Sequence, residues 1–162
     1  MINKKISFDF DGCLSDNHDG SLNIHKETAQ ENLKLAASLG YDVHIVTRRF
    51  DESNYYRGLQ NEHLPVLDMA KKLGVSEQKI HFTNRAWKYE TVKKLGSSLH
   101  IDDDEVDIQW IQRHSPEINT VLIGSENWQE NLLKYIEQDI RDNQKTNLLD
   151  KVKNFFKKIQ PF

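Results

Sequence analysis

Two aspartates lie two positions apart at the end of an apolar run near the N-terminus, in residues 4–12. Side chains alternate between the two faces of a strand, so Asp9 and Asp11 would leave by one face. The neighbouring Phe8 and Phe10 would enter a core by the other. Two acids placed in this way repel each other, and a hard divalent cation with oxygen ligands is the usual partner that relieves the repulsion. The alternative is an edge strand with two solvated aspartates.

A second acidic cluster also follows a short apolar stretch. Residues 97–101 lead directly into Asp102, Asp103 and Asp104, and Asp107 follows shortly after. If both apolar runs are neighbouring strands of a parallel sheet, the two clusters meet at the edge formed by the carboxyl ends of the strands. Open α/β sheets bind ligands at that edge. The sequence therefore predicts that acids far apart in the chain converge on one site.

Two further polar residues follow apolar runs in the same way. Thr47 directly follows the apolar residues 43–46. Lys88 comes shortly after the stretch 79–84, at the start of a predicted helix. A hydroxyl and backbone N–H groups after a strand can hold a phosphate oxygen, and the ammonium of a lysine can be directed to the same place. Taken singly, Thr47 fits a turn cap and Lys88 fits a surface lysine. Their shared position after apolar strands favours one common site.

This order of motifs resembles the haloacid dehalogenase (HAD) superfamily of phosphohydrolases, in its minimal-cap form. The resemblance extends thinly over most of the chain, from the first motif to the fourth. The matching residues are Asp9-Phe10-Asp11-Gly12 for the first motif, Thr47 for the second, Lys88 for the third, and Asp103 with Asp107, beside Asp102, for the fourth. The resemblance implies a three-layer, Rossmann-like α/β domain whose central parallel sheet is flanked by helices, without a separate cap domain.

The resemblance also implies a mechanism. Asp9 would attack phosphorus and form an aspartyl-phosphate that water then hydrolyses, while Asp11 would protonate the leaving oxygen and later deprotonate the water. The family's Mg²⁺ would be held by a carboxylate oxygen of Asp9, the backbone carbonyl of Asp11 and the side chain of Asp103. A site with few carboxylates and several waters suits this cation.

The remaining motif residues would bind the phosphoryl group or support the site. Thr47 and Lys88 would neutralise phosphoryl oxygens, an electrostatic effect that grows in the transition state. Asp102 and Asp107 would orient Lys88 or metal-bound waters. Spacing alone leaves open whether Asp102 or Asp103 contacts the metal, and the interval from Asp103 to Asp107 favours Asp103.

An arginine-rich stretch follows the second motif. Arg48, Arg49 and Arg57, with aromatic residues nearby, could bind the substrate by holding a second phosphate or by stacking on a base. The alternative is a polar loop in which the arginines pair with Asp51 and Glu52. The formal net charge of −3 argues against broad nucleic-acid binding.

The predicted function is that of a Mg²⁺-dependent phosphatase acting on a nucleotide or another small phosphomonoester, with a polynucleotide 3′-phosphate as a variant. The gaps between motifs leave no room for a cap domain, so the site should be open, with the loop around His18 as a small flap. His18 itself either contacts substrate or is solvated. The alternative function is a metal- and phosphate-binding regulatory module that does little chemistry and acts through a partner.

Length and composition set the outer bounds. From its length of 162 residues, the chain is expected to form a catalytic domain in residues 1–143, followed by an amphipathic tail in residues 144–162. No apolar stretch is long enough to span a membrane and no signal peptide is evident, so a cytoplasmic protein is expected. Cys13 is the only cysteine, which excludes an intramolecular disulfide and suits a reducing compartment.

Strands and helices alternate along the chain, which is typical of a parallel sheet covered on both faces. Glycines and a proline mark the helix boundaries. The predicted helices cover about 24–39, 65–73, 88–95, 106–113 and 128–140, and the last predicted strand covers 120–123. Apolar residues at helical spacing in the lysine-rich tail predict a further helix. It would pack on its own domain, or mediate self-association or peripheral membrane contact.

Overall fold

The computed structural model describes residues 2–53 and 61–159, which form an α/β fold around one sheet. All five strands run parallel, in the spatial order β3-β2-β1-β4-β5. The strands are β1 (Lys5–Phe8), β2 (Asp42–Thr47), β3 (Ile80–Phe82), β4 (Ser97–Asp102) and β5 (Asn119–Leu122). The sequence-based prediction of a parallel α/β sheet is therefore confirmed.

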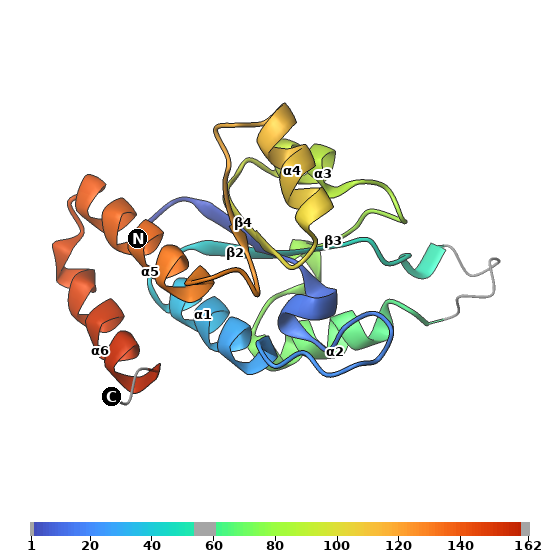
Figure 1. Cartoon of the computed structure of the whole chain (residues 1–162), viewed down its shortest axis with the longest axis horizontal. Helices are drawn as coiled ribbons and strands as arrows, with labels where there is room; N and C mark the ends of the chain where they lie inside the picture. Colours follow the sequence, from blue (N-terminus) through green and yellow to red (C-terminus); the bar gives the residue numbers. More distant parts are fainter. Residues whose placement is uncertain (1, 54–60, 160–162) are drawn as a thin grey trace.

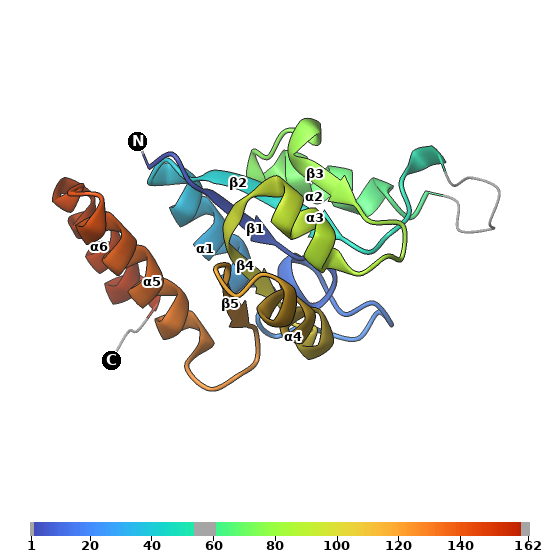
Figure 2. The same cartoon turned by 90° about the horizontal axis from the view of Figure 1, so that it is seen from above.

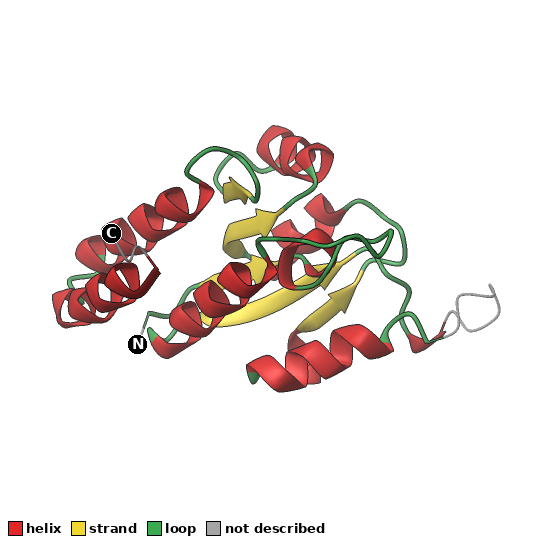
Figure 3. Ribbon diagram, turned by 60° about the horizontal axis from the view of Figure 1, so that its bottom comes forward, coloured by secondary structure: helices red, strands yellow, loops and turns green. Residues whose placement is uncertain are grey.

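Helices flank the sheet on both faces, as Figures 1 and 3 show. The helices are α1 (Lys26–Ser38), α2 (Leu64–Leu73), α3 (Lys88–Leu95), α4 (Glu105–His114), α5 (Trp128–Asp142) and α6 (Leu149–Ile159), with the short turns η1 (Phe10–Leu14), η3 (Glu77–Lys79) and η4 (Thr146–Leu148). In Figure 1, α3 and α4 lie on one face of the sheet, and α1 and α2 lie on the other. This is the predicted three-layer, Rossmann-like arrangement.

The central strands are buried on both faces, which explains their nearly continuous apolar runs. Their fully buried apolar side chains include Ile6, Phe8, Ile45, Val46, Leu99 and Ile101. A larger apolar cluster joins the sheet to α1, α2 and α5, and a smaller one joins β2 to α3 and α4. Packing on both sides fixes the carboxyl ends of β1, β2 and β4 next to one another.

Proline and glycine set the helix ends where the sequence predicts them. Pro65 lies in the first turn of α2, and Gly74 and Gly96 cap α2 and α3 with φ of 75° and 73°. Glycine adopts this left-handed conformation at little cost. The first helix begins at Lys26 rather than near residue 24. The side-chain amide of Asn23 donates to the carbonyls of Cys13 and Ser15, and its Oδ1 accepts the backbone N–H of His25, so this segment remains a turn.

The C-terminal helix packs on the rest of the described chain. Figures 1 and 2 show α6 beside α5. Leu149 and Val152 of α6 are buried in the larger core cluster, whereas the lysines of this helix are exposed. Asp139 of α5 binds the ammonium of Lys4 and, at 2.6 Å, the hydroxyl of Tyr41. Of the helices in the described ranges, none combines the length and the apolar character needed to cross a bilayer.

The connections that follow β1 and β2 are short where they are described. Turn η1 and one loop lead from β1 to α1, and α2 and η3 precede β3. No second folded unit occurs within the described parts of these connections. Arg57, with the rest of residues 54–60, lies outside the described residues.

Candidate functional site

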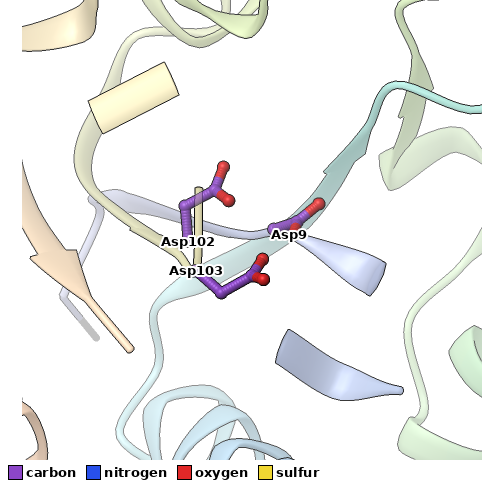
Figure 4. A group of neighbouring side chains, drawn as sticks. All are labelled: Asp9, Asp102 and Asp103. Carbon is purple, nitrogen blue, oxygen red and sulfur yellow. The ribbon is translucent and has the colours of Figure 1, made fainter. Parts of the chain in front are cut away.

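Three carboxylates converge where β1 and β4 end, as Figure 4 shows. The two strands are neighbours, and the backbone N–H of Asp9 continues their pairing by donating to the carbonyl of Ile101 at 2.9 Å. Asp102 is the last residue of β4 and Asp103 follows it. One carboxylate oxygen from each of the three aspartates lies within 4.8 Å of the others. The predicted convergence of acids that are distant in sequence is confirmed.

The three acids carry more negative charge than the site balances. Asp9 and Asp102 are buried, whereas Asp103 is exposed. Burial and the neighbouring carboxylates of Asp102 and Asp103 raise the pKa of Asp9 well above its usual value, against the opposing charge of Lys88. Burial also raises the pKa of Asp103. Carboxylate oxygens with unbalanced charge are a donor set that fits a hard divalent cation such as Mg²⁺.

Lys88 is the cation at the centre of this cluster, and its side chain is only 3% exposed. Its Nζ lies 2.7 Å from carboxylate oxygens of Asp9 and Asp102 and 3.5 Å from Asp107. Lys88 begins α3, and its backbone N–H donates to the other oxygen of Asp107 at 3.2 Å. Burial alone would lower the pKa of Lys88, but the three carboxylates, with Asp102 first, raise it well above its usual value. The ammonium is therefore held charged.

Both carboxylate oxygens of Asp102 are engaged in hydrogen bonds, one of them with Lys88. Its Oδ2 accepts hydrogen bonds from Lys88 at 2.7 Å and from Nε2 of His100 at 2.9 Å, and its Oδ1 accepts the backbone N–H of Asp104 at 2.9 Å. Burial opposes ionisation of Asp102, but Lys88 and His100 bring its pKa below the usual value. Asp103, in contrast, lines the adjacent cavity. This geometry favours Asp103 over Asp102 as the acid available to a metal.

A buried polar chain behind Asp102 is absent from the sequence-based prediction. Nδ1 of His100 lies 2.8 Å from Oγ of Ser7, and that oxygen lies 2.9 Å from Oγ of Ser97. All three residues are buried. A polar residue inside an apolar strand is the signal that could have indicated this chain, because a buried polar group needs a hydrogen-bond partner.

The turn after β1 brings its glycine under Asp103. Asp11 has extended backbone angles, and Gly12 has a φ of 70°. A Cβ atom added to Gly12 would overlap the carboxylate of Asp103. Glycine is therefore required both for the backbone conformation and for the close approach. The next residue, Cys13, is buried, and burial raises the pKa of its thiol well above the usual value, which suits a structural cysteine.

Thr47 ends β2 next to these acids but does not line the cavity. It is fully buried, and its Oγ1 accepts the backbone N–H of Arg49 at 3.3 Å. Its hydroxyl therefore shapes the turn from which Arg48 and Arg49 extend. The structure places the predicted threonine behind the site rather than in direct contact with the cavity.

Arg49 pairs with the first motif. Its Nε and Nη2 donate to the two carboxylate oxygens of Asp11 at 2.9 and 2.7 Å, and its Nη1 donates to the carbonyl of Glu62 at 2.7 Å. The alternative in which the arginines pair with Asp51 and Glu52 is therefore wrong for Arg49. Because β1 and β2 are adjacent, the acid that follows β1 lies within hydrogen-bond distance of Arg49.

Arg48 extends along another part of the same wall. Its guanidinium carbon lies 4.5 Å from the ring centroid of Trp87, and its Nη1 lies 3.8 Å from Oδ2 of Asp104. Arg85 forms an ion pair with Glu62 and also faces the cavity. The sequence-based site omits Arg85, Trp87 and Glu62. For Arg85 and Trp87, the only signal in the sequence was their closeness to Lys88.

A cavity of about 560 Å³ opens at this edge of the sheet. Its wall includes Asp9, Asp11, Asp103, Arg48, Arg49 and Lys88. His18, from the loop between η1 and α1, also lines it, with Nε2 4.0 Å from Oε1 of Glu62. The loop expected to act as a flap therefore reaches the cavity. The arrangement offers oxygen ligands for a metal next to several fixed cations, which is suited to binding an oxyanion.

In comparisons with known proteins, no family model and no curated protein matches this chain.

Proposed function

We propose that this protein is a Mg²⁺-dependent phosphatase of the HAD superfamily that hydrolyses a nucleotide or another small phosphomonoester. The observation that carries the proposal is the convergence of Asp9, Asp103 and Lys88 on one cavity, from the ends of two adjacent strands and the start of a helix. A metal held by Asp9, Asp103 and the backbone carbonyl of Asp11 would supply charge stabilisation at the phosphoryl oxygens.

Asp9 is suited to act as the nucleophile. Its Oδ1 lies 2.7 Å from Nζ of Lys88, which orients the carboxylate and offsets part of its charge. A carboxylate oxygen of Asp9 attacks phosphorus, and the bond from phosphorus to the ester oxygen breaks. The product is an aspartyl-phosphate. Water then attacks phosphorus, releases phosphate and restores the carboxylate.

Asp11 would transfer the protons of both steps. In its acid form, with a proton taken up from solvent, it gives that proton to the leaving oxygen, and as the resulting carboxylate it takes one from the attacking water. Its ion pair with Arg49 has to open before it can do so, since both carboxylate oxygens are engaged. Once released, the Arg49 guanidinium can bind oxygens of the incoming phosphoryl group. Substrate entry would thus exchange one anionic partner of Arg49 for another.

The test is hydrolysis of p-nitrophenyl phosphate and a nucleotide panel, with and without Mg²⁺. We expect metal-dependent turnover that Asp9→Asn lowers by at least about a thousand-fold. Asp150→Asn is the matched control, because Asp150 is exposed on α6 and does not line the cavity. Thermal unfolding of each variant checks that it is folded. If the wild type turns over no ester in the panel, the phosphatase proposal fails and the regulatory alternative takes its place.

A further inference from the structure

One of the cavity's cations lacks a close carboxylate. Lys88 and Arg49 each lie 2.7 Å from a carboxylate oxygen, and Arg85 forms a tight ion pair with Glu62. The acidic partner of Arg48, Asp104, is 3.8 Å away. Within residues 2–53 and 61–159, the buried Nε of Arg48 has no hydrogen-bond partner at all. Arg48 therefore keeps hydrogen-bonding capacity that the described chain does not use.

Arg48 is nevertheless held in place. Its guanidinium lies over the ring of Trp87, and its Nη2 donates to the carbonyl of Arg85 at 3.4 Å. The backbone N–H of Arg85 donates in return to the carbonyl of Arg48 at 2.8 Å. These contacts restrict a side chain that would otherwise lose much rotamer freedom on binding. A fixed guanidinium with spare donors is a preorganised oxyanion site.

The neighbouring charges do not remove this capacity. Asp104 caps α4, where its Oδ1 accepts the backbone N–H groups of Val106 and Asp107 at 2.9 and 3.4 Å, so its carboxylate is fixed in position. Arg48 and Arg85 line the same wall, where Glu62 pairs closely with Arg85 and only the more distant Asp104 offsets the charge of Arg48. Like charges held close together are stabilised by an anion that binds between or beside them.

We propose that Arg48 binds a second oxyanion, carried by the leaving group of the phosphate ester. The inference rests on the proposed phosphatase function and deepens it by naming the substrate class: a phosphomonoester whose alcohol part bears its own carboxylate or phosphate. The reacting phosphoryl group lies at Asp9 and Lys88, and the second anion lies at Arg48, on the wall of the same cavity.

Non-hydrolysable ligands test this assignment without relying on turnover. In the presence of Mg²⁺, the binding of 3-phosphonopropionate is compared by calorimetry with that of propylphosphonate, which lacks the carboxylate. A third ligand, 1,3-propanediphosphonate, distinguishes a second phosphate-type anion from a carboxylate. We expect the wild type to bind one of the two doubly anionic ligands at least about ten-fold more tightly than propylphosphonate, since hydrogen bonds to charged groups contribute about 1.5–3 kcal/mol.

The variants assign the preference to Arg48. Arg48→Met should abolish it, and Arg48→Lys should retain only part of it, because lysine keeps the charge and loses the planar fork. Arg113→Met is the matched control: Arg113 also lies near a tryptophan ring, that of Trp110, but outside this cavity, and the preference should persist. Equal binding of all three ligands by the wild type, or an unchanged preference in Arg48→Met, overturns the inference and leaves the phosphatase proposal standing. If no phosphonate binds and no ester is hydrolysed, the proposed function fails and the inference fails with it.

Discussion

Arg49 and Asp11 are joined by two parallel hydrogen bonds, from Nε and Nη2 of the arginine to the two oxygens of the carboxylate, at 2.9 and 2.7 Å. Each side chain is 17% exposed. This pair ties the loop after β2 to the turn after β1 at the wall of the cavity. The hydrogen bond to Asp11 is the main cause that raises the pKa of Arg49, so the guanidinium stays charged.

A double-mutant cycle of Asp11→Asn and Arg49→Met should therefore give a coupling energy of about 1–3 kcal/mol. Bidentate, charge-assisted hydrogen bonds in a half-buried site are stronger than those of exposed ion pairs. The measurement is the free energy of unfolding by urea for the four proteins. The exposed pair Glu31 and Lys34 provides a control cycle, expected below about 0.5 kcal/mol. Similar coupling in both cycles would contradict the prediction.

Lys88 stabilises the site by compensating buried carboxylates. Replacing it by methionine leaves Asp9, Asp102 and Asp107 without their common cation, and loss of one partner of a buried ion pair costs about 3–5 kcal/mol. Lys88→Met should be destabilised by about that amount in urea unfolding. Lys93→Met, which removes an exposed lysine from the same helix, should change stability by less than about 0.5 kcal/mol. A small effect at Lys88 would mean that this ammonium is not needed to compensate the three carboxyl groups around it.

The sequence predicts those parts of the site in which a polar residue directly follows a strand or begins a helix. Polar residues after apolar runs indicate strand ends, and parallel strands bring those ends to one edge, so the convergence of Asp9 with Asp103 and Lys88 follows from topology. Which charged side chains pair with one another does not follow from the topology in this way. Arg49 pairs with Asp11, which is distant in sequence, because the adjacent strands β1 and β2 bring the two side chains within reach of each other.

The hydrogen-bonded polar residues behind the site could not be predicted from the local sequence pattern either. His100 could equally be a strand residue facing solvent, and only the register of β1 with β4 places it opposite Ser7. Glu62, which pairs with Arg85, lies just before α2, far along the chain from the residues it contacts. Helix ends were predictable because Pro65 and Gly74 act through backbone geometry, which depends on the residue itself.

Gly12 is expected to link the turn after β1 to metal binding. A Cβ atom there would displace the carboxylate of Asp103, and alanine would also be strained at a φ of 70°. With 10 mM Mg²⁺, the melting temperature of the wild type should rise by about 2–8 °C, as expected for a ligand that binds only the folded state. Gly12→Ala should lose most of that rise.

Gly20→Ala separates the two effects. Gly20 has a comparable φ of 84°, but an added Cβ would meet no atom within 4 Å. Both variants should lose about 1–2 kcal/mol from backbone strain, measured without metal. Only Gly12→Ala should also lose the response to Mg²⁺. An equal response in the two variants would show that Asp103 does not hold the cation.

Lys4 and Tyr41, which directly precede β1 and β2, contact α5, and this contact predicts a loss of stability at alkaline pH. The hydroxyl of Tyr41 donates to Asp139 at 2.6 Å, and Lys4 binds the other carboxylate oxygen. Burial first, and then the hydrogen bond and charge of Asp139, raise the pKa of Tyr41 well above its usual value. Its hydrogen bond to Asp139 also raises the pKa of Lys4.

The direction in which the free energy of unfolding changes with pH depends on whether the folded or the unfolded state releases its proton first. An unfolded tyrosine titrates near pH 10, whereas folded Tyr41 keeps its proton above that pH. The unfolded state then binds fewer protons than the folded state, so the free energy of unfolding decreases as pH rises above about 10, by up to about 1.4 kcal/mol per pH unit for one proton. Lys4 acts in the same direction. Below pH 10 the contribution of Tyr41 is fully present.

Tyr41→Phe should therefore make the stability profile between about pH 10 and pH 11 shallower than that of the wild type, as measured by urea unfolding at closely spaced pH values. Tyr89→Phe is the control. The hydroxyl of Tyr89 bonds Glu90 at the surface, where solvent screens the interaction, so its removal should alter the slope much less. If the two variants have the same alkaline slope, Tyr41 is not protected by Asp139, and the attachment of α5 to the start of the sheet is weaker than the structure indicates.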